Sequence, residues 1–254
     1  HGVMNTDNMS IAGETIDYGP CAFMDSYHPS TVFSFIDQMG RYAYQNQPGI
    51  AHWNLAQLAQ TLLPLIDDDE QTAINYAQEA IDSYPERFEQ AYLTGMRSKL
   101  GLVEAHDDDT ALIADLLDAM ANHKADFTLT FRRLCELSAI RTDDNIEHDN
   151  HVRELFDDPS AFDQWVMAWR QRLTREASED SQRKSAMRCV NPAFIPRNHQ
   201  VEAVIQAAVK DEDFVPFEKL VSVLANPYNT QPENQKYTIP PQADEIVRNT
   251  FCGT

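Results

Sequence analysis

The chain has 254 residues, 43% of them hydrophobic, and can bury a substantial core as one large domain or two small ones. Its 40 acidic and 20 basic residues give a formal net charge of −20, so we expect neither nucleic acid nor a membrane as a partner, and a location in a bacterial cytoplasm. The four cysteines form no Cys-x-x-Cys pair, which argues against a zinc site and against a disulfide framework.

The first 20 residues carry the most informative motif of the chain. Residues 1–8 read His-Gly-Val-Met-Asn-Thr-Asp-Asn, and residues 17–19 read Asp-Tyr-Gly. This order is typical of the catalytic and metal-binding loops of kinase-like phosphotransferases, in which an Asn and a second Asp hold magnesium on the nucleotide phosphates. The Asp that would act as the base after His-Gly is replaced by Val3. The pattern therefore predicts a nucleotide-handling site that does something other than ordinary phosphorylation.

The chemistry of this motif depends on three oxygen-bearing side chains. We expect a short β-hairpin over residues 9–17, with its turn at residues 12–14, which would bring Asp17 back beside Asn8. An amide oxygen and a carboxylate suit a hard cation, so we assign Asn8 and Asp17 as ligands of Mg²⁺, with Mn²⁺ as an alternative. Asp7 is the nearest remaining carboxylate and could accept a proton or orient a metal-bound water. The alternative interpretation is that Asp and Asn serve only the turn itself.

The rest of the chain has a helical pattern. We expect residues 1–50 to form the catalytic and metal-binding segment, residues 51–225 a bundle of helices, and residues 226–254 an extended tail. Within the bundle, Pro64 and the pair Tyr84-Pro85 limit helices, and residues 141–158 are predicted as a polar loop. The predicted fold class is therefore mainly α.

Three further groups have residue types that could carry chemistry. His148-Asp149-Asn150-His151 contains metal-ligand types, but its polar surroundings favour a solvated loop. Arg197 could reach a phosphate, whereas Asn198 is explained by N-capping of the following helix. Cys252, the third residue from the end, is a candidate redox residue, with an incidental cysteine as the alternative.

Several of these segments together resemble the selenoprotein O (SelO, YdiU) family of protein adenylyltransferases, which have a pseudokinase fold. The match is to the C-terminal half of such a protein. The segments that carry the resemblance are residues 1–11 (HGVMNTDNMSI), 15–20 (TIDYGP), 23–25 (FMD), 40–48 (GRYAYQNQP), 53–55 (WNL) and 191–199 (NPAFIPRNH).

The resemblance implies a fold and an activity. It implies the C-terminal lobe of a protein-kinase-like fold and the transfer of AMP from ATP to Ser, Thr or Tyr hydroxyls of protein substrates. By position, Asp7 matches the proton acceptor of the family, and Asn8 and Asp17 match its magnesium ligands, with Asp17 also near the nucleotide. The family's ATP-gripping residues lie in its N-terminal half, so we expect the chain alone to bind ATP weakly and to be nearly inactive.

The resemblance also bears on Cys252, which occupies the place of a selenocysteine or cysteine in the family. In some members this residue pairs with a cysteine shortly after the metal loop, but here Phe33 stands at that place and Cys21 is the nearest thiol. Two other functions stay open: a kinase-fold phosphotransferase and a catalytically dead helical interaction module.

Overall fold

The computed structural model describes residues 2–14 and 22–250, and these residues fall into two compact units. The first unit comprises His1–Cys21, Pro29–Leu93 and Asn249–Thr254, and the second comprises Ala22–His28 and Thr94–Arg248. Each unit is described by itself below.

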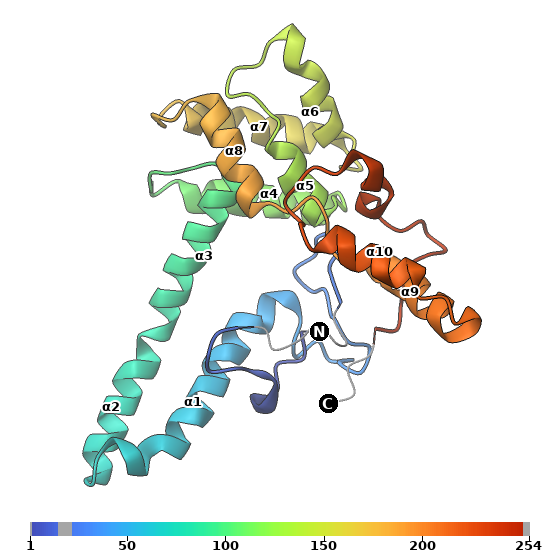
Figure 1. Cartoon of the computed structure of the whole chain (residues 1–254). Helices are drawn as coiled ribbons and strands as arrows, with labels where there is room; N and C mark the ends of the chain where they lie inside the picture. Colours follow the sequence, from blue (N-terminus) through green and yellow to red (C-terminus); the bar gives the residue numbers. More distant parts are fainter. Residues whose placement is uncertain (1, 15–21, 251–254) are drawn as a thin grey trace. The chain divides into compact units, whose positions relative to one another are not determined.

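The described residues form helices joined by loops (Figure 1). The first unit contains the 3₁₀-helices η1 (Thr6–Asn8) and η2 (Tyr44–Asn46), then α1 (Gln47–Ile66) and α2 (Glu70–Asp82), and α3 (Tyr84–Leu100) begins in it. The second unit contains the end of α3 and the following elements: α4 (Asp109–Asn122), α5 (Phe127–Leu134), η3 (Asp143–Asn145), α6 (Ile146–Arg153), α7 (Pro159–Leu173), α8 (Asp180–Val190), α9 (Asn198–Asp211), α10 (Val215–Leu224) and η4 (Pro232–Thr238). The prediction of a mainly α protein is confirmed, whereas the kinase-like lobe and the division at residues 50 and 225 stay predictions.

The β-hairpin predicted over residues 9–17 is not found in the described part of the chain. Residues 9–14 form a turn in which Gly13 N donates to Ser10 O at 3.1 Å and Ala12 N donates to Ser10 Oγ at 3.2 Å. Gly13 takes a positive φ of 68°, which favours glycine, and Ile11 is exposed. The local turn chemistry was therefore predicted correctly, whereas residues 9–14 form a turn and no strand. Residues 15–17 lie outside the described residues.

Side-chain caps set the helix boundaries of the first unit. At the start of α2, Asp69 Oδ1 accepts hydrogen bonds from Thr72 N at 2.9 Å and from Thr72 Oγ1 at 2.6 Å. The pKa of Asp69 lies below its ordinary value because these two bonds favour the carboxylate. α2 ends before Tyr84-Pro85, as predicted. α1 continues only two residues beyond Pro64.

The core of the second unit forms where α4 and α7 pack together. Trp165 Nε1 donates to Leu112 O at 2.8 Å, and Trp169 Nε1 donates to Leu100 O at 3.0 Å. Both indole rings are buried, so these bonds satisfy the polar end of each side chain inside an apolar core.

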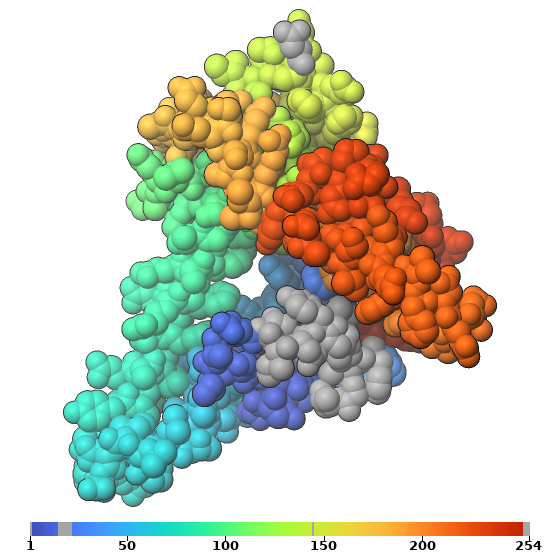
Figure 2. All heavy atoms as spheres, in the orientation of Figure 1, coloured from blue at the N-terminus to red at the C-terminus, as the bar shows by residue number. Residues whose placement is uncertain are grey.

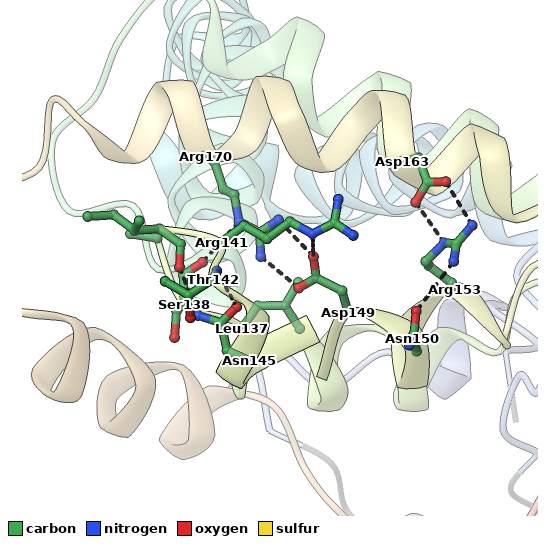
Figure 3. A network of polar contacts seen from close by, with 12 residues as sticks. Leu137, Ser138, Arg141, Thr142, Asn145, Asp149, Asn150, Arg153, Asp163 and Arg170 are labelled. Atoms are coloured by element: carbon green, nitrogen blue, oxygen red, sulfur yellow. Dashed lines mark hydrogen bonds and ion pairs between the residues drawn. The ribbon is translucent and has the colours of Figure 1, made fainter. Parts of the chain in front are cut away.

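The loop predicted over residues 141–158 is wrong, because much of this segment forms α6. Asp149, on the inner side of α6, accepts two hydrogen bonds from Arg170 of α7, at 2.9 and 2.7 Å, and lies 3.4 Å from Arg141 Nε (Figure 3). A buried carboxylate with two arginine partners is a specific anchor. The high polarity of the segment thus reflects buried ion pairs as well as solvation.

The extended tail predicted from residue 226 is also partly helical. Over η4, Tyr237 packs into a buried cluster with residues of α10 and of the segment before α9. The cluster consists of Ala193, Phe194, Leu220, Val223 and Tyr237. One aromatic anchor therefore fixes a segment whose Pro, Asn and Gln content predicted an extended conformation. No described helix is long and apolar enough to span a bilayer.

Lys99, in the last turn of α3, lies over two aromatic rings. Its Nζ atom is 4.8 Å from the ring centre of Phe131 and 5.8 Å from that of Phe127. Burial lowers the pKa of Lys99 from 10.5 to about 8. The folded pKa lies below the unfolded one, so the unfolded state binds more protons and stability rises with pH between the two values.

We therefore expect Lys99 to contribute a rise of up to about 3 kcal/mol in the free energy of unfolding between pH 8 and pH 10.5. Urea unfolding across this window should show the rise in the wild type relative to Lys99→Met. Lys124→Met, which removes an exposed lysine, should keep the wild-type dependence. Parallel pH profiles for the wild type and Lys99→Met would contradict this assignment.

Candidate active site

The loop that begins the chain is held in a compact conformation by its own hydrogen bonds. Asn8 N donates to Asn5 O at 3.0 Å, and Asn8 Nδ2 donates to Val3 O at 3.1 Å, closing residues 3–8 into one turn. Gly2 takes a φ of 68°, and a Cβ atom there would lie 2.6 Å from Phe33 Cδ2. Both the backbone conformation and the space therefore require glycine at the second position of the motif.

Two side chains from outside the loop fix its position. Asn54, buried on α1, donates from Nδ2 to Met4 O at 2.8 Å. The Tyr42 hydroxyl donates to Asn5 Oδ1. The loop is thus attached both to α1 and to the segment that precedes α1, and a loop held in this way suits a site that needs fixed geometry. The sequence did not single out Asn54 or Tyr42 as support for the loop, although both lie in segments that carried the family resemblance.

Two predicted site residues of the loop, the proton acceptor Asp7 and the metal ligand Asn8, lie in one turn. Asp7 is exposed and Asn8 is half-buried, and both belong to η1. Val3 is buried, so an aliphatic side chain occupies the interior where the motif otherwise carries a carboxylate. Asp17 and Cys252 lie outside the described residues, so the predicted approach of Asp17 to Asn8 and the redox role of Cys252 stay predictions.

The donor types of the loop fit a hard cation. The bond from Asn8 Nδ2 to Val3 O orients the amide, and an amide oxygen is a ligand type that Mg²⁺ accepts. Within the described ranges, no group of three or more His, Cys, Asp or Glu residues could hold a metal ion, and this includes the segment around His148 and His151. Among the described residues, Asn8 therefore offers a ligand type that suits the cation, and its role as a Mg²⁺ ligand together with Asp17 stays a prediction.

A family model described as "Protein adenylyltransferase SelO" matches residues 1–225. The chain belongs to the SelO family. A "Protein nucleotidyltransferase YdiU" of Bradyrhizobium diazoefficiens is 56% identical over 254 residues, which is 100% of this chain and 50% of that protein. Its namesakes in Rhodopseudomonas palustris strain BisB18 and in Methylorubrum extorquens are 58% and 55% identical and are covered over 50% and 51% of their lengths. The chain thus spans about half the length of the curated relatives it matches.

SelO membership confirms the resemblance predicted from the sequence.

The second unit contains a buried ion cluster that the sequence did not predict. Arg197 is 1% exposed, and its guanidinium contacts Asp126 at 2.8 and 3.2 Å and also pairs with Asp25. Burial raises the pKa of Asp25, although the Arg197 charge opposes this rise. Arg197 therefore serves an internal ion cluster, and its predicted alternative as a phosphate ligand is not supported.

Asn198, the residue after Arg197, forms hydrogen bonds with the backbone of Phe23. The prediction that Asn198 caps a helix is wrong, because Arg197 is the capping residue of α9 and has no side-chain cap bond. Asn198 instead accepts from Phe23 N and donates to Phe23 O, both at 2.9 Å. A signal was present in the sequence: Arg197 follows the apolar run of residues 192–196, where a charge needs a buried partner.

Proposed function

We propose that the chain provides the catalytic loop of a magnesium-dependent protein adenylyltransferase. In this reaction, a Ser, Thr or Tyr hydroxyl of a protein substrate attacks the α-phosphorus of ATP, the oxygen–phosphorus bond forms, and pyrophosphate leaves. The observation that carries the proposal is the turn at residues 3–8, in which Val3 is buried while Asp7 is exposed beside Asn8. The SelO family assignment supports the same activity.

Asp7 is the proposed proton acceptor for the substrate hydroxyl. Among residues 2–14, only Asp7 and Glu14 carry a carboxylate, and only Asp7 belongs to the same turn as Asn8. Val3 has no group that could take a proton. General-base assistance by a positioned carboxylate makes the hydroxyl a better nucleophile as the new bond forms.

Asn8 and Asp17 are the proposed ligands of Mg²⁺, with Mn²⁺ as an alternative, and Asp17 would also lie near the nucleotide. When bound, the metal would neutralise charge on the phosphate oxygens of ATP. Asn8 would contribute its amide oxygen, in an orientation set by the bond from Nδ2 to Val3 O. We also propose that the chain forms the C-terminal lobe of a kinase-like fold. Cys252 is proposed as a redox residue.

Mass spectrometry distinguishes this function from its two alternatives. For this test the chain is joined, in the natural order, to the half of the Bradyrhizobium relative that it does not span; we refer to the product as the joined protein. Incubation with ATP, Mg²⁺ and candidate protein substrates should add adenylyl groups to hydroxyl side chains. Addition of phosphate alone would favour a phosphotransferase, and no addition under any condition would favour a non-catalytic helical module.

A further inference from the structure

The helix that supports the catalytic loop has an unusual composition. Over its 20 residues, α1 contains no Asp, Glu, Lys or Arg, in a chain whose residues are 24% charged. Every other α-helix among the described residues carries at least one charged side chain. A helix without a charged face is typical of a helix that is covered on more than one side.

α1 carries an exposed stripe of leucines. Leu55, Leu58, Leu62 and Leu65 follow one another at spacings of three, four and three residues, which places them on one face of the helix. Leu58 is 37% exposed, Leu62 38% and Leu65 82%. Elsewhere on α1, His52 Nε2 lies 3.2 Å from Ile81 O of α2, so α2 already packs against this helix. The leucine stripe is an apolar side of α1 that remains exposed over Leu58, Leu62 and Leu65.

A cavity of about 300 Å³ extends this stripe to the catalytic loop, which lies beside α1 in Figures 1 and 2. Ile11, on the loop side of the cavity, is 90% exposed. The cavity is lined by Thr6, Met9, Ser10, Ile11, Asn54, Leu55, Gln57, Leu58 and Thr61. Leu55 and Leu58 of the stripe therefore also form part of the cavity wall.

The cavity also contains a buried polar atom that lacks a partner. Asn54 is 6% exposed, and its Oδ1 atom has no hydrogen-bond partner in the part of the chain that the structure describes. The amide cannot be turned over without loss, because Nδ2 donates to Met4 O at 2.8 Å and Oδ1 could not. A buried acceptor of this kind is normally satisfied, so Asn54 leaves an unmet acceptor in the wall of the cavity.

We propose that the leucine stripe and the adjoining cavity are a docking surface for an apolar helix face from the half of the SelO relatives that this chain does not span. The relatives are similar to this chain over its whole length and are about twice as long, so in them the surface coexists with a second segment of similar size. The absence of charge on α1 selects an apolar occupant rather than a basic one.

Site-resolved cysteine labelling tests the proposal. Leu62→Cys on the stripe and Val209→Cys on the exposed side of α9 are each made in the chain alone and in the joined protein, with circular dichroism to confirm folding. Reaction with a bulky maleimide is followed by peptide mass mapping, with the native exposed Cys189 as the internal reference. We expect labelling at position 62 to be roughly tenfold slower or more in the joined protein, with little change at position 209.

Two results would overturn the proposal. Equal labelling of position 62 in the chain alone and in the joined protein would show that the second half leaves the stripe open. Protection of position 62 that rises with concentration in the chain alone would show that a second copy covers it. The readout is accessibility rather than catalysis, so a failure of the proposed adenylyl transfer would not affect it.

Discussion

Replacing Arg197 with Met should lower the free energy of unfolding by about 3–5 kcal/mol, because the substitution leaves the buried carboxylate of Asp126 and the half-buried carboxylate of Asp25 without their shared cation. Both carboxylates lie on segments that Arg197 joins to the start of α9, and Arg197 Nε also donates to Thr238 O at 3.0 Å. The substitution therefore removes contacts that connect several separate segments of the second unit, and this is why a large loss of stability is expected. Urea unfolding of the chain at neutral pH measures it.

A matched control and a rescue distinguish the buried cluster from a general effect of losing charge. Lys124→Met breaks the exposed pair with Asp157 and should change the free energy of unfolding by less than about 1 kcal/mol. Adding Asp126→Asn to Arg197→Met should restore part of the loss, since Asn keeps an acceptor for Leu129 N at the start of α5. Equal losses for Arg197→Met and Lys124→Met would contradict a dominant role of the cluster.

The sequence predicts the elements that depend on local chemistry. The pair Tyr84-Pro85 separates α2 from α3, as predicted, and the cap at Asp69 and the apolar spacing of Trp165 and Trp169 on α7 are local signals of the same kind. The motif around Asp7 and Asn8 indicated a candidate site because its residue types and spacing are specific. These signals all lie within a few residues of the feature they define.

Features that depend on distant partners were missed. Asp149 lies in a polar segment and Arg197 follows an apolar run, but only the positions of Arg170 and Asp126 show which charged group each of them pairs with. The hairpin predicted over residues 9–17 is described only to residue 14, where the chain forms a turn, and a suitable turn at Gly13 does not by itself make a strand. Tyr237 fixes η4 through a cluster whose other members are 14 or more residues away in the chain.

Replacing Asp7 with Asn in the joined protein should lower the turnover number for adenylyl transfer by about 10²- to 10⁴-fold, with little change in the apparent affinity for ATP. The amide keeps the size and much of the polarity of the carboxylate but cannot accept the hydroxyl proton. Asp7 is exposed, so the substitution should leave the free energy of unfolding nearly unchanged. A loss of turnover without a loss of stability would place the effect at the chemical step.

Glu14→Gln is the matched control, because Glu14 is the other carboxylate of residues 2–14, is exposed, and lies outside the turn that holds Asn8. Its turnover should equal that of the wild type. Near-normal turnover of Asp7→Asn would show that Asp7 is not the base. The rate would then depend on the metal-bound nucleotide and on substrate positioning. A reduced affinity for Mg²⁺ in Asp7→Asn, with normal turnover at saturating Mg²⁺, would instead assign Asp7 to the metal site beside Asn8.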